Sequence, residues 1–179
     1  MPAACSIKLE EWIRTETYGS SVVVDFGAGF FDKLNCVSHH AKKIGIEVFP
    51  SYCAYAKPGI RVVCADMRNW AAHIKGPECD TAMLIDTIEH LPKDDGLKLL
   101  RELTEAFRKI IVFTPEGFYP QDADVTGFGN EWQVHESGWT ADEFHELGFA
   151  AEVDPTFHKE SEGAPQDGGA IFAAWERCA

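Results

Sequence analysis

The most constraining feature of this sequence is an apolar run that ends in an acid and two glycines. It covers residues 22–30 and reads VVVDFGAGF. A short β-branched run that ends in Gly-x-Gly predicts a buried strand followed by a sharp turn. Glycine has no Cβ, so a ligand can approach such a turn closely, and a helix that follows would present free N–H groups to it. An ordinary packed turn has the same pattern, so the choice depends on the rest of the chain.

An acid lies twenty residues beyond the first glycine of this turn. Glu47 closes a second short apolar run, residues 44–48. An acid at this distance is typical of the side chain that binds ribose hydroxyls at the end of a neighbouring strand. We therefore interpret the glycine turn and Glu47 as parts of one nucleoside-binding site.

The glycine pattern differs from that of a dinucleotide-binding loop. Such a loop needs a third glycine, which would fall at position 32, where this chain has Asp32. A pyrophosphate at that place would face an acid. Further acids lie in or just after the first four expected strands, at Asp25, Glu47, Asp66 and Asp86. This acidic rim favours a cofactor with an adenosine and a positive charge over a cofactor with two phosphates.

Apolar periodicity divides the chain into alternating strands and helices. Further strands are expected at residues 44–48, 60–64, 81–85 and 110–113, and two more near 149–153 and 170–175, separated by a polar loop at 159–169. Helices are expected at residues 6–18, 30–42, 51–57, 66–74, 92–107 and 140–148. This alternation implies a parallel sheet with right-handed crossovers. Residues 116–138 show no periodicity, which indicates a functional loop on the substrate side.

Length and composition limit the kind of protein. With 179 residues, of which 45% are hydrophobic, the chain predicts a single domain over residues 1–179. It has no run of eighteen apolar residues and no signal-like start, so we expect a cytoplasmic protein without a membrane segment. The six cysteines are scattered without a Cys-x-x-Cys pair, which favours free thiols. We expect no metal site.

The charge of the chain bears on its partners. The formal net charge is −13, from 29 acidic residues against 16 Lys and Arg, and no dense basic run offsets it. Proteins that dock on nucleic acid usually present a basic face to the phosphates. We therefore expect a small-molecule acceptor, or a partner that carries positive charge, and not a nucleic acid. The oligomeric state is left open.

Taken in order, these segments resemble the class I S-adenosylmethionine-dependent methyltransferases. The resemblance covers roughly residues 20 to 176 and rests on DFGAG at 25–29, Glu47, CADM at 64–67 and the run at 79–91 that ends in Glu-His-Leu. It implies an α/β fold: a Rossmann-like, doubly wound, mostly parallel seven-stranded sheet with helices on both faces. The last strand would be antiparallel and inserted into the sheet.

The resemblance also implies S-adenosyl-L-methionine as cofactor. The glycine loop would hold its methionine portion, Glu47 its ribose, and Asp66 with Met67 its adenine. Phe31 stands where many members have a third glycine, and we expect it to narrow the methionine end of the pocket. The expected cofactor-binding residues are Asp25, Phe26, Gly27, Ala28, Gly29, Glu47, Val48, Asp66, Met67 and Asp86.

The domain is expected to have three parts. Residues 1–19 form an N-terminal helix that either covers the crevice as a lid, with Trp12 or Tyr18, or packs on the edge of the sheet. Residues 20–115 form the cofactor-binding half. Residues 116–179 supply the substrate-side loop, a helix and the last two strands.

Methyl transfer from a sulfonium is a direct displacement, which needs alignment, exclusion of water and at most one base. The candidate catalytic residues are His135, Glu89 and His90. A histidine titrates near neutral pH and can accept a proton from a hydroxyl or an amine. His135 has the stronger case because it lies in the substrate-side loop, although a histidine that only fastens this loop fits the sequence too. His90 also fits a purely structural role.

Aromatic residues and the choice of function remain open at this level. Trp132, Trp139 and Tyr119 can form a wall for a planar or sugar-like acceptor, or the loop's own small core. The favoured function is methyl transfer to a hydroxyl or amine of a small or medium acceptor, such as a sugar or a natural product. The alternatives are a non-catalytic module that binds adenosylmethionine or a partner, and a nicotinamide-dependent oxidoreductase.

Overall fold

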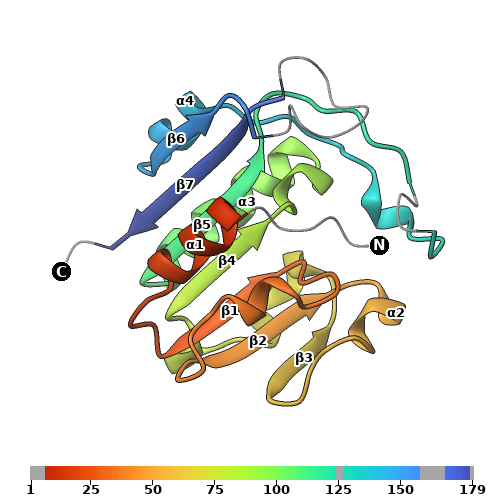
Figure 1. Cartoon of the computed structure of the whole chain (residues 1–179), viewed down its shortest axis with the longest axis vertical. Helices are drawn as coiled ribbons and strands as arrows, with labels where there is room; N and C mark the ends of the chain where they lie inside the picture. Colours follow the sequence, from red (N-terminus) through yellow and green to blue (C-terminus); the bar gives the residue numbers. More distant parts are fainter. Residues whose placement is uncertain (1–6, 124–126, 158–167, 178–179) are drawn as a thin grey trace.

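The computed structural model describes residues 7–123, 127–157 and 168–177. Its centre is one seven-stranded sheet with the strand order β3-β2-β1-β4-β5-β7-β6 (Figure 1). The strands are β1 (Val22–Phe26), β2 (Lys42–Glu47), β3 (Ile60–Cys64), β4 (Thr81–Ile85), β5 (Lys109–Pro115), β6 (Ala150–Asp154) and β7 (Ala170–Glu176). The α-helices are α1 (Ile7–Glu16), α2 (Pro50–Cys53), α3 (Lys93–Ala106) and α4 (Ala141–Glu146).

Five short 3-10 helices connect these elements. They are η1 (Lys33–Asn35), η2 (Met67–Ala72), η3 (Gly76–Glu78), η4 (Ile88–His90) and η5 (Glu131–Gln133). None of the helices in the described ranges is long and apolar enough to cross a membrane.

The direction of β7 distinguishes this sheet from an all-parallel one. Strands β3, β2, β1, β4 and β5 pair in parallel, whereas β7 runs antiparallel to both β5 and β6. In register, Phe113 of β5 lies opposite Phe172 of β7. The expected fold, with a last strand inserted in the opposite direction, is confirmed.

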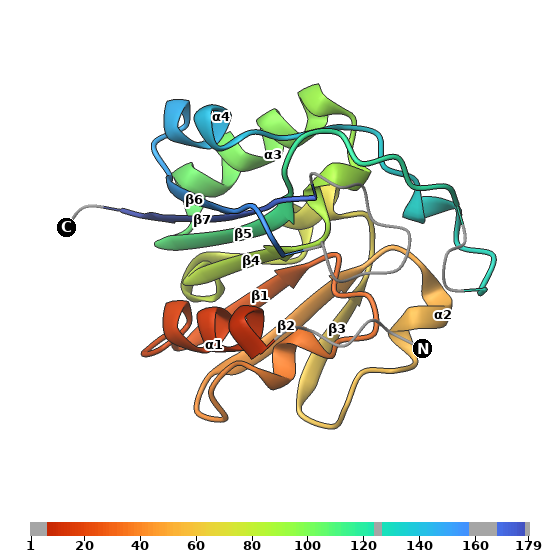
Figure 2. The same ribbon diagram turned by 45° about the horizontal axis from the view of Figure 1, so that its top comes forward.

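Two apolar cores cover the two faces of the sheet. Helices α3 and α4 lie on one face and α1 lies on the other (Figure 2). Along β1, Val22, Val24 and Phe26 pack on the side of α3 and α4, and Val23 packs on the side of α1. Successive side chains of a strand point to opposite faces, so a strand that is covered on both sides has to be apolar throughout. This is why residues 22–24 are a continuous run of valine.

Helices α3 and α4 follow their sequence signals. Leu100 and Leu103 of α3 are fully buried, as is Phe107 directly after it. In α4 the Thr140 hydroxyl accepts the Glu143 N–H, and the Glu143 carboxylate accepts the Thr140 N–H. This capping box satisfies two backbone groups at the start of the helix.

The helix expected at residues 30–42 is wrong, because only η1 forms there. Gly29 and Phe31 have φ of 51° and 63°, in the left-handed region, where a right-handed helix cannot continue. The Phe31 ring lies over Gly45 of β2, so closely that a Cβ on Gly45 would approach the ring to 2.4 Å. Phe31 is therefore a core residue, and its expected role in narrowing the pocket is also wrong.

Other differences concern short connections. The segment expected as a helix at 66–74 consists of 3-10 turns with non-helical backbone at Asn69. The helix expected at 51–57 is the single turn α2. Residues 1–6, most of the loop expected at 159–169, and the last two residues lie outside the described part of the chain.

Candidate active site

A cavity lies where β1, β2 and β4 end, at the carboxyl edge of the sheet. This is the edge at which doubly wound sheets bind ligands. Nine of the ten expected cofactor-binding residues line it: Asp25, Gly27, Ala28, Gly29, Glu47, Val48, Asp66, Met67 and Asp86. The parallel pairing of the strands brings these distant segments together.

Phe26 is the expected residue that does not line the cavity. Its side chain is fully buried in the core, with edge contacts to Trp70 and Phe107 at centroid distances of 6.3 and 5.9 Å. The reason is the alternation of the strand, which turns Asp25 and Phe26 to opposite faces.

The glycine turn is held by its own backbone. The N–H groups of Gly27 and Ala28 both donate to the Ile46 carbonyl at 2.9 Å, and the Gly29 N–H donates to the Glu47 carboxylate at 2.8 Å. Gly27 has φ of 74°, and a Cβ there would lie 2.4 Å from Cγ2 of Thr87. The expected helix N-terminus with free N–H groups is therefore wrong, since these three donors join β1 to β2.

Glu47 connects the glycine turn to the end of β2. Its carboxylate accepts N–H bonds from Gly29 at 2.8 Å and from Phe49 at 2.7 Å. Burial raises the pKa of Glu47, and these backbone bonds partly oppose the shift. Each carboxylate oxygen has more than one acceptor position, so ribose hydroxyls can still bind there.

Asp25 is the most unusual group of the cavity. It is 2% exposed, and its Oδ2 has no hydrogen-bond partner among the described residues. Burial, and then the neighbouring Asp32, raise its pKa well above the usual value. A buried polar atom without a partner costs free energy, and a cationic or N–H-donating ligand would remove that cost.

Two further acids differ in how they are held. The hydrogen bonds from Arg68 keep the pKa of Asp66 below its usual value although burial opposes this, and they leave fewer acceptor positions for a ligand. Asp86 has φ of 50° and donates its N–H to Phe113 at 2.9 Å. Asp86 is exposed by surface area, yet the loss of solvent around its carboxyl group, together with the nearby Glu89 carboxylate, raises its pKa to about 7.

The charge of the lining is strongly negative. Five acids surround the cavity, and among its described lining residues Lys33 is the one with a permanent positive charge. Lys33 lies 3.6 Å from Asp32. The arrangement suits a ligand with a cationic centre and a single carboxylate better than a pyrophosphate.

Sequence reasoning missed several lining residues, among them Phe30, Tyr52, Thr87 and Asn130. Phe30 and Tyr52 stack at a centroid distance of 4.3 Å and form an aromatic side of the cavity. Phe30 directly follows the glycine turn and so carried a usable signal. Tyr52 and Asn130 lie in segments whose path depends on tertiary contacts.

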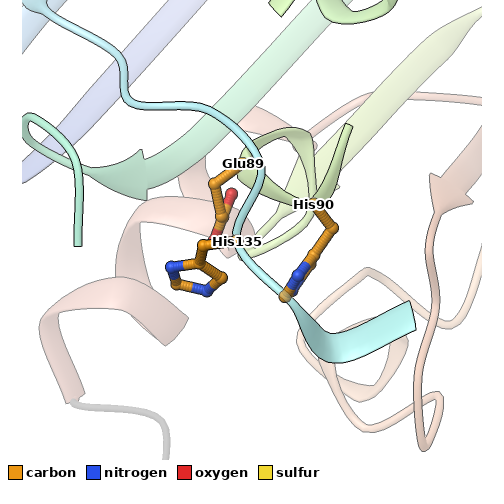
Figure 3. A group of neighbouring side chains, drawn as sticks. All are labelled: Glu89, His90 and His135. Atoms are coloured by element: carbon orange, nitrogen blue, oxygen red, sulfur yellow. The ribbon is translucent and has the colours of Figure 1, made fainter. Parts of the chain in front are cut away.

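The side chains of the three catalytic candidates lie close together (Figure 3). His90 lines the cavity, whereas Glu89 and His135 lie beside it and do not. The rings of His90 and His135 meet edge to face with centroids 4.8 Å apart. The buried Glu89 carboxylate accepts a hydrogen bond from Thr114 at 2.9 Å.

The loop at residues 116–138 is fastened to η4. The N–H groups of Glu136 and Ser137 donate to the Glu89 carbonyl at 2.8 and 3.1 Å. Trp132 lines the cavity, while Trp139 is fully buried in the core and donates from Nε1 to the Ser137 hydroxyl. The proposed aromatic wall is therefore wrong for Trp139, which packs over Lys93 and belongs to the core.

The N-terminal helix lies on the sheet. Leu9 and Ile13 are buried in the core, and Trp12 contacts the Phe172 ring at 5.2 Å. Tyr18 is 86% exposed. Neither Trp12 nor Tyr18 is among the residues that line the cavity.

The strand order and the site at the carboxyl edge define the fold of the class I S-adenosylmethionine-dependent methyltransferases. No family model and no curated protein sequence matches the chain. Its likeness to known proteins therefore lies in their structures.

Three solved structures illustrate this likeness. The N-terminal domain of EvdMO1, in the presence of SAH and D-fucose, is 11% identical with a TM-score of 0.68, over 96% of this chain and 82% of that one. A SAM-dependent methyltransferase from Archaeoglobus fulgidus is 15% identical with a TM-score of 0.65, over 94% and 91%. The methyltransferase domain of bacterial CtHen1-CN is 18% identical with a TM-score of 0.58, over 88% and 91%.

Proposed function

We propose that this protein transfers the methyl group of S-adenosylmethionine to a hydroxyl or amine of a small or medium acceptor. The observation that carries the proposal is the buried Asp25, which lines a cavity with five acids and whose Oδ2 has no hydrogen-bond partner in the described part of the chain. A sulfonium cofactor brings two positive centres, the sulfur and the α-ammonium group. These positive centres would compensate the charge of a carboxylate whose burial and acidic neighbours oppose its ionisation.

The other parts of the cofactor have suitable partners in the same cavity. Lys33 offers a cation for the methionine carboxylate, and Glu47 offers carboxylate oxygens for the ribose hydroxyls. Met67 and the stacked pair of Phe30 and Tyr52 provide apolar surface for the adenine. The same lining disfavours a nicotinamide dinucleotide, because its pyrophosphate would face Asp25 and Asp32.

The reaction is a displacement at the methyl carbon. A lone pair of the acceptor oxygen or nitrogen forms the new bond to carbon, the carbon–sulfur bond breaks, and its electron pair stays on sulfur. The acceptor loses one proton to a base or to solvent. The protein's main contribution is to align the nucleophile with the methyl group and to exclude water.

Charge and one structural neighbour support a small acceptor. The net charge of −13 opposes association with a polyphosphate backbone. The EvdMO1 domain was crystallised in the presence of a sugar, D-fucose, with a similar fold. We therefore favour a sugar-like or natural-product acceptor.

A transfer assay tests this function. The whole chain is incubated with S-adenosylmethionine that carries a labelled methyl group and with panels of hydroxyl and amine acceptors, including deoxysugars. We expect label to appear in a small-molecule acceptor. Label that appears only in RNA or DNA would contradict the assigned acceptor class, and a chain that binds the cofactor but labels no panel would favour a non-catalytic binding module.

A further inference from the structure

We propose that Glu89, His90 and His135 bind one divalent cation of the first transition series at the edge of the cavity. Each residue offers a ligand atom, and these atoms lie within 4.8 Å of one another. Two of the residues come from η4 and the third from the loop that η4 anchors (Figure 3). This proposal replaces the expectation, drawn from the scattered cysteines, that the chain has no metal site.

Both imidazoles are held in the tautomer that leaves Nε2 able to bind a metal. Nδ1 of His90 lies 3.0 Å from the Val134 carbonyl, and Nδ1 of His135 lies 2.6 Å from the Tyr119 carbonyl. A carbonyl only accepts, so each Nδ1 carries the proton and each Nε2 keeps its lone pair. Metal-binding histidines are commonly oriented by such a bond from the second ring nitrogen.

Glu89 supplies the negative charge of the site. The carboxylate accepts the Thr114 hydroxyl and backbone N–H groups of Thr87 and Glu89, and these bonds orient it. Glu89 is 3% exposed. A cation beside it would compensate this buried carboxylate, and the Asp86 carboxylate is near enough to interact with the same charge.

The backbone already holds the ligands close to a metal-binding geometry. Two N–H bonds from Glu136 and Ser137 to the Glu89 carbonyl fix the position of His135 relative to η4. A cation at about 2.1 Å from each ligand needs the ligands to be about 3–3.5 Å apart. The ligand atoms lie within 4.8 Å of one another, so the side chains have to rotate closer together when the cation binds.

The ligand types indicate which cation binds. Two imidazoles and one carboxylate suit Mn²⁺, Fe²⁺, Co²⁺ or Zn²⁺, and they are poor ligands for Ca²⁺, which prefers oxygen alone. Three protein ligands leave coordination positions open. His90 lines the cavity, so those positions face the place where an acceptor would bind.

The site makes the proposed function more specific, and this step rests on that function. A hydroxyl bound to the cation becomes more acidic and releases its proton to solvent. The oxygen then attacks the methyl carbon, and the electrons of the broken carbon–sulfur bond stay on sulfur. The cation thus favours a hydroxyl acceptor over an amine and takes the place of a general base.

A titration with Mn²⁺ tests the site without cofactor or acceptor. Mn²⁺ is added to the whole metal-free chain, and free Mn²⁺ is measured by electron paramagnetic resonance. We expect saturation at one Mn²⁺ per chain, and binding weakened roughly tenfold or more by Glu89→Gln and by His135→Gln. Circular dichroism and S-adenosylmethionine titration verify that each variant is folded.

The surface pair His39 and His40 provides the matched control. Their rings lie 3.8 Å apart, and both side chains are exposed, so they are an alternative place for adventitious binding. The double variant His39→Gln/His40→Gln should bind Mn²⁺ like the parent. Absence of saturable binding, or binding that the double variant loses and His135→Gln retains, would overturn the proposal.

Failure of the metal site can be distinguished from failure of the proposed methyltransferase function. A Glu47 variant should lose affinity for S-adenosylmethionine and keep Mn²⁺ binding, whereas His135→Gln should show the reverse. Mn²⁺ binding without any cofactor binding would refute the methyltransferase proposal and retain the metal site.

Discussion

At the scale of single residues, the buried acid Asp25 near the end of β1 lowers the stability of the folded chain at neutral pH. Asp25 is buried, its Oδ2 has no partner among the residues that the structure describes, and its raised pKa means that folding shifts its carboxyl group toward the protonated form. For an acid with a raised pKa, the folded state loses stability relative to the unfolded state as pH rises above the ordinary aspartate value. The cost is therefore present at neutral pH and absent in acid.

Replacing Asp25 tests this cost. Asp25→Asn should increase the free energy of unfolding at pH 7 by about 1 kcal/mol or more, and by less at pH 4, where the parent is already protonated. Urea unfolding of the cofactor-free chain at both pH values measures it. The exposed Asp122→Asn should change neither value. An equal effect of Asp25→Asn at both pH values would show that charge is not the cause.

The two glycines of the turn should respond differently to a methyl group. Gly27→Ala combines positive φ with a clash against Thr87 and should cost about 3 kcal/mol or more, whereas Gly29→Ala meets open space and should cost about 1–2 kcal/mol for its backbone alone. Thermal or urea unfolding gives both values. Adding Thr87→Ala to Gly27→Ala should recover part of the loss, and a double variant with no recovery would argue against the clash.

At the scale of elements, the strands follow from apolar runs and the turn after β1 does not. Runs such as residues 22–24 and 81–85 predict their strands because a strand covered on both faces must be apolar. The spacing of apolar residues at 30–37 resembles a helix, yet Phe31 takes a positive φ to place its ring over Gly45. Tertiary packing decides this segment against its local pattern.

The adjacent residues Phe30 and Phe31 give a matched test of the turn. Phe31→Leu should lower the free energy of unfolding by about 1–2 kcal/mol with little change in cofactor affinity, because the ring is in the core. Phe30→Leu should lower cofactor affinity with little change in stability, because Phe30 lines the cavity. Unfolding experiments and S-adenosylmethionine titrations on both variants test these two expectations. The reverse pattern would contradict the placement of the two rings.

At the scale of the whole molecule, the sheet brings residues that are far apart in the sequence close together in space. Nine expected residues from four segments meet at one edge because the strands are parallel and their order is fixed. Residues Glu89 and His135 are 46 positions apart, and no spacing rule links them. Their contact depends on backbone hydrogen bonds between the loop and η4, which a sequence pattern does not reveal.

The parts of the site that could be predicted from the sequence are those with a local sequence signal. Acids and glycines at strand ends carry local signals, so Glu47 and Gly27 could be assigned from the sequence. Tyr52 lies in a segment whose expected helix is only one turn, Asn130 lies in a segment without periodicity, and Trp139 belongs to the core and not to the cavity lining. The sequence does not reveal how irregular segments pack against distant parts of the chain, so the places of these residues could not be predicted.

The most direct test of the account is a calorimetric titration of the purified chain and of Glu47→Gln with S-adenosylmethionine and, separately, with NADH. We predict saturable binding of S-adenosylmethionine alone, weakened in Glu47→Gln by about 1–3 kcal/mol through loss of a charged acceptor for the ribose. Binding of NADH alone, binding of neither ligand, or equal affinity of parent and variant for S-adenosylmethionine would contradict the account.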